Sequence, residues 1–417
     1  MYLRGSKFNM TRRRRNSSPL FILTLLIMIA VVVYINLVVV PATPPLFIPT
    51  NTPTTSPATF IKNAEDLIAQ GKILQGMAAY QEAIKSDPRN SATYITLAQL
   101  QVFNGDFQSA IDNAQNAMLI NASNSMANAI YGWALGYKGD YLGALGAIKK
   151  AIDLDPNNGI AYAYEAEVLT LQYQAGQDIL GVIQKATDAS REAQRLAPNA
   201  LETHRARGLV LNITQNYEEA VNEFKAAIAI NPNIADLHLS LGTNLKALNQ
   251  YAQAVEEFNR ANALNPADPL PNTYIAGTYL TLGDFPKAIQ YAQQAVKVSP
   301  LDPYMYGNLA KMFYANHQYR ESLDPFRLAI YGGTTTDNVQ VKGLPMDNST
   351  VVEYYYLFGL AAARVNACSD ALKISQYLQE NAADNEIAVY NAKEMVNICQ
   401  QWITGTSTPT REITPAK

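Results

Sequence analysis

The chain of 417 residues is poor in the residue types that build metal centres and catalytic sites, with only two cysteines and three histidines. His204, His238 and His317 lie far apart in the sequence, and no Cys/His group has the spacing of a zinc site. No glycine-rich phosphate loop, G-x-S-x-G or S-x-x-K pattern stands out. We therefore expect no metal, no cofactor and no enzymatic activity.

Charged residues are also scarce, at 16 % of the chain, and they are unevenly placed. The first nineteen residues hold six of the 32 basic residues and none of the 35 acidic ones. The rest of the chain carries 26 basic residues against 35 acidic ones, a net charge of −9. An acidic chain without a basic stripe argues against a nucleic-acid partner. Because 48 % of the residues are hydrophobic, the chain is also not a disordered one.

Residues 20–40 form an uncharged apolar run of 21 residues, and a bilayer-spanning helix needs about 20. Basic residues precede the run, and the first one after it is Lys62. The positive-inside rule then predicts that residues 1–19 are a cytoplasmic tail, residues 20–40 are a single-pass signal-anchor helix and the C-terminal domain is extracytoplasmic. The alternative is a cleaved signal peptide, but its apolar region normally has about 7–15 residues and ends at an A-x-A site, which is not evident here.

Two polar segments flank the remaining sequence. Residues 41–59 contain six prolines and six threonines, which predicts an extended stalk. Residues 405–417 are similarly polar, and we expect a disordered tail.

Between these segments the sequence repeats. Pro198, Pro232, Pro266 and Pro300 follow one another at intervals of 34 residues, and Pro88 and Pro156 are two such intervals apart. Two small residues precede these positions, twelve and five residues earlier, and an aromatic residue often lies three residues before the first small one. The small residues are Gly76, Ala110, Ala144, Ala186, Ala220, Ala254 and Ala288, then Ala83, Ala117, Ala151, Ala193, Ala227, Ala261 and Ala295. This pattern resembles the tetratricopeptide repeat (TPR).

The resemblance implies an all-α fold, a right-handed superhelical solenoid of about nine helix-turn-helix repeats. It would occupy residues 60–404, with units starting near 58, 91, 125, 159, 201, 235, 269, 303 and 352. Each proline ends a unit, because it cannot continue a helix. Unit four carries an eight-residue insertion around residues 171–180, and a helix at about 385–404 would cap the array.

In the TPR family, the first helices of the units line a concave groove that binds protein or peptide partners. The corresponding residues here are Gln99, Trp133, Glu167, Glu202, Arg205, Asn212, Asp236, Thr243, Lys246, Tyr304, Lys311, Tyr314 and Tyr356. Chaperone-binding members grip a terminal carboxylate with Lys, Asn and Arg, and that full set is not evident in this sequence. His204 and His238 share one repeat position, which predicts packing between helices.

Residues 331–352 interrupt the array. Gly332, Gly333, Gly343 and Pro345 break helices, while Val339, Val341, Val351 and Val352 suggest short strands. Such a loop is either functional or a tolerated insertion. Residues 153–159 faintly resemble a calcium loop, although helix termination explains them better.

The two cysteines lie at matching heights in the last helical pair. Cys368 is fifteen residues before the turn near Ala383, and Cys399 is sixteen residues after it. Facing cysteines on packed antiparallel helices can approach the ~5.5–6 Å Cα separation of a disulfide. We predict a Cys368–Cys399 bond, the alternative being two buried thiols.

Together these features predict a membrane-anchored scaffold that holds protein or peptide partners outside the cytoplasm, for example in envelope assembly or in quality control of exported proteins. A groove that binds cell-envelope glycan is the alternative. An enzyme is disfavoured, since the repeats leave no catalytic domain. The sequence does not fix the oligomeric state.

Overall fold

The computed structural model describes residues 18–39, 55–177 and 181–405 and divides the chain into two compact units, residues 1–55 and 56–417. In the first unit, α1 (Pro19–Tyr34) continues into a π-helix (Ile35–Val39). The twenty helical residues from Pro19 to Val38 have a mean hydropathy of 2.8. By length and composition, this segment is long and apolar enough to cross a membrane. The predicted basic tail (except residues 18 and 19), most of the stalk and most of the C-terminal tail lie outside the described residues.

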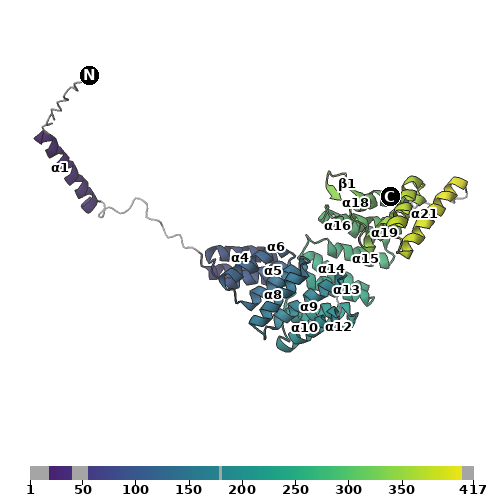
Figure 1. Cartoon of the computed structure of the whole chain (residues 1–417), viewed down its shortest axis with the longest axis horizontal. Coiled ribbons are helices and arrows are strands. Elements are labelled where there is room, and N and C mark those ends of the chain that lie inside the picture. Colours follow the sequence, from purple (N-terminus) through teal and green to yellow (C-terminus); the bar gives the residue numbers. More distant parts are fainter. Residues whose placement is uncertain (1–17, 40–54, 178–180, 406–417) are drawn as a thin grey trace, which may run out of the picture. The chain divides into compact units, whose positions relative to one another are not determined.

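The described residues of the second unit form nine helical pairs followed by one further helix, and Figure 1 shows their arrangement as an array. The first helices of these pairs are α3 (Pro57–Ala69), α5 (Ser91–Phe103), α7 (Ser125–Tyr137), α9 (Gly159–Gln174), α11 (Leu201–Ile213), α13 (Ala235–Ala247), α15 (Leu270–Thr281), α17 (Pro303–Ala315) and α19 (Ser349–Arg364). The second helices are α4 (Ile73–Ser86), α6 (Phe107–Ile120), α8 (Tyr141–Leu154), α10 (Val182–Leu196), α12 (Tyr217–Ile230), α14 (Tyr251–Leu264), α16 (Phe285–Val298), α18 (Tyr319–Tyr331) and α20 (Cys368–Asn381). The last helix is α21 (Glu386–Thr404). We call the pairs units one to nine; the all-α solenoid is therefore as predicted.

Local sequence sets where these helices begin and end. The side chain of Asp106 accepts a hydrogen bond from the backbone N–H of Ser109 and so caps the start of α6; aspartates cap α8 and α16 in the same way. In the turn inside unit two, Gly105 has a φ of 81°, which glycine adopts without strain. Asn249 takes the same left-handed conformation in unit six.

Small residues let the two helices of a unit pack closely. In unit six, Ala254 and Ala261 of α14 are fully buried. A Cβ on Gly242 of α13 would lie 2.5 Å from a ring carbon of Phe258. The ring of Phe258 therefore fills the space that the missing side chain leaves.

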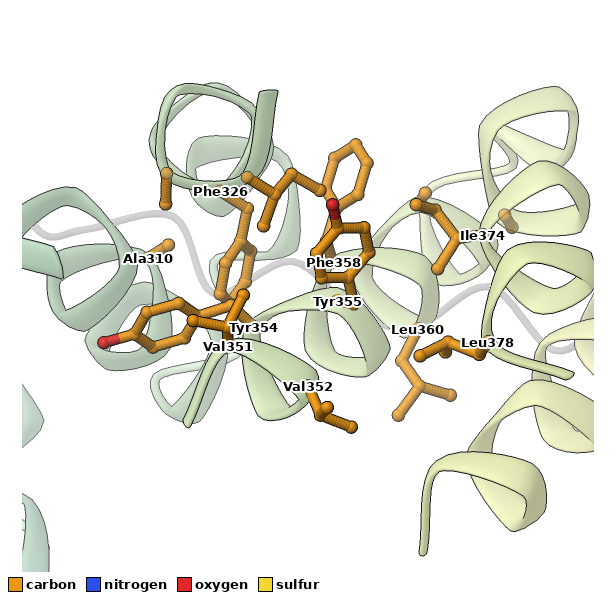
Figure 2. Packing of buried hydrophobic residues seen from close by; sticks show 14 of the residues in the cluster. Ala310, Phe326, Val351, Val352, Tyr354, Tyr355, Phe358, Leu360, Ile374 and Leu378 are labelled. Atoms are coloured by element: carbon orange, nitrogen blue, oxygen red, sulfur yellow. The ribbon is translucent and has the colours of Figure 1, made fainter. Parts of the chain in front are cut away.

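The C-terminal units share a core of buried aromatic and aliphatic side chains, part of which Figure 2 shows. Phe326 of α18 and Phe358 of α19 lie with ring centroids 6.4 Å apart, and Ile374 and Leu378 of α20 close the same core.

The interruption before α19 contains one short antiparallel hairpin, β1 (Gly332–Thr334) with β2 (Gln340–Lys342). Val341 lies in β2, as predicted, whereas Val339 precedes this strand and is not part of it. The expectation of strands at Val351 and Val352 is wrong, because both residues are in α19 and belong to the C-terminal core. Burial of their β-branched side chains outweighs their strand preference.

At the end of the array a disulfide joins Cys368, the first residue of α20, to Cys399 of α21, with a Cα–Cα distance of 5.6 Å. The bond ties the last helix to the ninth unit.

Candidate functional site on the inner surface

In units two to nine the first helices of successive units lie side by side. We call the surface of these helices that carries the predicted groove residues, from Gln99 to Tyr356, the inner surface. In units two to six it is closed by its own side chains. Trp133, Glu167 and Arg205, which were predicted to line an open groove, are 0 %, 1 % and 3 % exposed. The expectation of an open groove at these three residues is therefore wrong, since their side chains pack against one another instead of facing solvent.

Arg205 of α11 is the centre of this closed region. Its guanidinium forms ion pairs with Glu167 of α9 and with Asp236 of α13, the latter at 2.7 Å. It also donates to the hydroxyl of Tyr137 at 2.6 Å and lies 5.6 Å from the ring centroid of Trp133. We call Tyr137, Glu167, Arg205 and Asp236 the arginine network.

The protonation states in the arginine network follow from this geometry. Burial raises the pKa of Tyr137, so its hydroxyl keeps its proton and donates to Glu167 at 2.6 Å. Burial alone would lower the pKa of Arg205, but Glu167, Tyr137 and Asp236 raise it well above its ordinary value. The guanidinium thus stays charged and links α11 to three other first helices, α7, α9 and α13.

Two further contacts close the same region. Gln99 of α5 donates hydrogen bonds to Glu202 of α11 and to the hydroxyl of Tyr164 at 3.2 Å. Asn233, in the turn before α13, donates to the backbone oxygen of Ile68 at the end of α3, at 3.1 Å. Units one and six therefore touch, although they lie far apart in the sequence.

A cavity of about 570 Å³ remains beside the arginine network. Phe103, Phe107 and Leu239 contribute apolar walls, while Asp236 and Asp268 contribute carboxylates. Burial raises the pKa of Asp268, and a backbone hydrogen bond from Leu270 opposes this.

In units six to nine the inner surface is more accessible. Lys246, Lys311, Tyr314 and Tyr356 are all partly exposed. Lys311 of α17 pairs with Glu353 of α19 at 2.9 Å. Lys246 has no hydrogen-bond or ion-pair partner among the described residues, and burial, followed by the charge of Lys311, lowers its pKa.

Three other predicted residues are partly exposed and make local contacts. Asn212 donates to Asn244 at 3.0 Å, Thr243 donates to the backbone oxygen of Ser240, and Tyr304 accepts from Asn348 at 3.0 Å. These bonds lie within one unit or between neighbouring ones.

The sequence reasoning missed Phe103, Tyr137, Tyr164 and Glu353. Phe103 and Tyr137 are 34 residues apart and each ends a first helix, so the repeat itself held a signal for an aromatic pair at this position. Glu353 had no such signal, because it follows the interruption of the repeat.

His204 and His238 pack between helices, as predicted, whereas His317 is exposed in the turn between α17 and α18. His238 is 3 % exposed, with Nδ1 2.6 Å from Glu257 and Nε2 2.9 Å from the oxygen of Pro232. Within the described residues, no group of three His, Cys, Asp or Glu side chains is placed to hold a metal ion. In the calcium-like segment, the side chain of Asn158 caps α9.

Comparison with protein families supports the repeat assignment. Three models match, one described as TPR repeat over residues 208–246 and two described as tetratricopeptide repeat over residues 235–268 and 275–336. The chain is a tetratricopeptide-repeat protein. The TPR fold serves protein–protein interaction as a scaffold.

Solved structures include two distant likenesses to this TPR chain. A chain of the APC/C hetero-tetramer Cut9–Hcn1 is 16 % identical, with 60 % of this chain and 48 % of that one covered and a TM-score of 0.46. A tetratricopeptide repeat protein from Parabacteroides merdae ATCC 43184 is 15 % identical, with 66 % and 99 % covered and a TM-score of 0.44. This chain thus spans about half the length of the first structure. No curated protein matches the sequence significantly.

Proposed function

We propose that the TPR protein is a membrane-anchored scaffold whose array lies outside the cytoplasm and binds a protein or peptide segment along the inner surface of units six to nine. The apolar helix that begins at Pro19 and the basic residues before it support the anchor and its orientation. A role in envelope assembly or in the care of exported proteins is consistent with such a position.

One observation favours the inner surface of units six to nine as the binding surface. Lys246 is half-buried, and no acidic group of the described chain neutralises its ammonium. A partly desolvated cation of this kind gains most from an acidic group supplied by a ligand. Tyr314 and Tyr356 lie on the first helices α17 and α19, and tyrosine offers a large apolar face together with a hydroxyl for such a segment.

Site-specific photocrosslinking of the full-length protein in its membrane tests this proposal. A photoreactive amino acid at Tyr356 should give defined protein adducts that Lys246→Glu abolishes. The same amino acid at Tyr390 of α21, which is 70 % exposed, should give none of these adducts. Retention on envelope glycan without any protein adduct would instead support the glycan-binding alternative.

The anchor is tested separately by mass spectrometry of the mature N-terminus. The proposal expects the intact N-terminal segment in the membrane fraction. A mature chain that begins near residue 42 would show a cleaved signal peptide and would contradict the anchor.

A further inference from the structure

A second groove lies between the second helices of units three and four, away from the inner surface. It has a volume of about 950 Å³. Its floor is one face of α9, and its two walls are α8 and α10. Floor and walls are helical stripes, with lining residues at Tyr162, Glu165, Leu169 and Gln172 of α9, at Tyr141, Leu145, Lys149 and Ile152 of α8, and at Val182, Lys185, Ala189 and Glu192 of α10.

The insertion in unit four coincides with this groove. Helix α9 has 16 residues, whereas the first helices α7 and α11 have 13 each. The additional turn adds Gln172 to the floor, and the longer connection moves the start of α10 further along the chain. The groove follows α8 from Tyr141 to Asp153, which corresponds to about 18 Å of helix.

The two ends of the groove differ in chemistry. Because α9 runs antiparallel to both walls, the start of α8 faces the end of α9 and the start of α10. This end holds the apolar side chains of Leu145, Leu169 and Val182, next to the polar residues Asp140, Gln172 and Gln177. Leu142 at its rim is 87 % exposed. The opposite end contains carboxylates from all three helices, namely Asp153, Glu165, Asp188 and Glu192.

Among these carboxylates Glu165 is distinct. Asp153, Asp188 and Glu192 pair with Lys149, Arg191 and Arg195 of their own helices. Glu165 is partly buried and has no hydrogen bond or ion pair among the described residues, although Lys149 and Lys185 lie near enough to influence it. Burial raises the pKa of Glu165, and these two lysines oppose the rise.

The walls also restrict the form of an occupant. The backbone groups of α8, α9 and α10 are already paired within their helices, so an extended peptide would find no strand edge and would bury unpaired amides. A helix satisfies its own backbone and needs only a matching stripe of side chains.

We propose that the groove formed by α8, α9 and α10 binds an amphipathic helix of a partner protein, about three to four turns long, with apolar residues at one end and a Lys or Arg at the other that pairs with Glu165. The site is independent of the inner surface, because it uses the opposite side of α9. The scaffold would then hold two partners at once.

Peptide selection on the full-length chain in lipid nanodiscs tests the site. Random 16-residue peptides displayed on phage are selected on the unaltered chain, and the enriched sequences are synthesised for affinity measurement. We expect apolar residues at helical spacing and a basic residue near one end. Glu165→Gln and Leu142→Glu should each weaken binding about tenfold or more, since each removes one half of the complementarity.

Two controls separate recognition from folding. Leu119→Glu changes an equally exposed leucine of α6, 84 % exposed, and should leave peptide affinity unchanged. In a charge exchange, Glu165→Lys should recover binding of a peptide whose basic residue is replaced by Glu, which a general loss of structure would not allow.

Several results would overturn the proposal. One is failure to enrich any peptide with apolar residues at helical spacing and a basic residue. Another is peptide affinity in the Glu165→Gln and Leu142→Glu variants that equals the affinity of the unaltered chain. A third is enrichment of acidic sequences. Self-association of the full-length chain that Leu142→Glu abolishes would show that the occupant is a second copy, and it would equally reject the proposed partner.

Discussion

The most demanding test of the closed inner surface is the replacement Arg205→Met, which removes a guanidinium and keeps an apolar side chain of similar length. The side chains of Arg205 and Glu167 are 4 % and 2 % exposed, so Glu167 would lose its counter-charge without gaining water. Asp236 has a side chain 36 % exposed and can be solvated in part. Removing one partner of a buried pair costs about 3–5 kcal/mol, and we expect a loss of stability in this range.

A double variant makes the origin of this cost explicit. Glu167→Gln in the Arg205→Met background removes the stranded charge and keeps an oxygen that can accept from Tyr137. We expect it to recover at least about 2 kcal/mol, seen as a coupling energy in the double-mutant cycle. Arg191→Met is the matched control, because its ion pair with Asp188 is exposed and such pairs contribute only about 0.2–1 kcal/mol.

The assay is native-state hydrogen exchange of α9 and α11, followed by mass spectrometry at increasing urea. It reports the free energy of opening for these helices even where the array does not unfold in one step. If Arg205→Met costs no more than Arg191→Met, or if the double variant recovers nothing, the arginine network does not stabilise the inner surface as argued.

Three further predictions concern other parts of the array. Cys368→Ser with Cys399→Ser removes a link across 31 residues, which the chain-entropy relation values at about 3.7 kcal/mol, and it should speed hydrogen exchange in α20 and α21; unchanged exchange would contradict a stabilising bond. In urea titrations Gly242→Ala should lower the free energy of unfolding by about 1–3 kcal/mol, because the added Cβ meets an aromatic ring. Gly146→Ala, whose Cβ meets open space, should raise it by about 0.5–1 kcal/mol. The reverse order would refute the packing argument. Because burial lowers the pKa of Lys246, its acylation rate should rise at lower pH than that of a free lysine derivative, and a coincident pH profile would reject the shift.

The sequence predicted the order of the helices because the signals for it are local. A proline after six of the nine described second helices and a left-handed turn residue inside each unit set the boundaries without reference to distant residues. The start of α13 at Ala235 and of α17 at Pro303 could therefore be read from the 34-residue interval alone.

The closed inner surface could not be predicted in this way. Whether Arg205 faces solvent or Glu167 depends on the angle between successive units, which accumulates over several pairs and leaves no periodic trace in the sequence. The groove at Glu165 depends on an insertion whose length was visible but whose effect on α9 was not. Val351 lies in a helix because its side chain is buried in the C-terminal core, and this burial outweighs the local strand preference of valine.

The hydrogen bond from Asn233 to Ile68 has a mechanical consequence. In a simple solenoid each unit contacts only its neighbours, so that a pull on one end peels the units away one at a time. Here the turn before α13 is hydrogen-bonded to the end of α3. Tension applied at α3 therefore also acts on unit six, through a contact 165 residues further along the chain. Units one to six should therefore unfold under tension in a single larger step, and not one unit at a time.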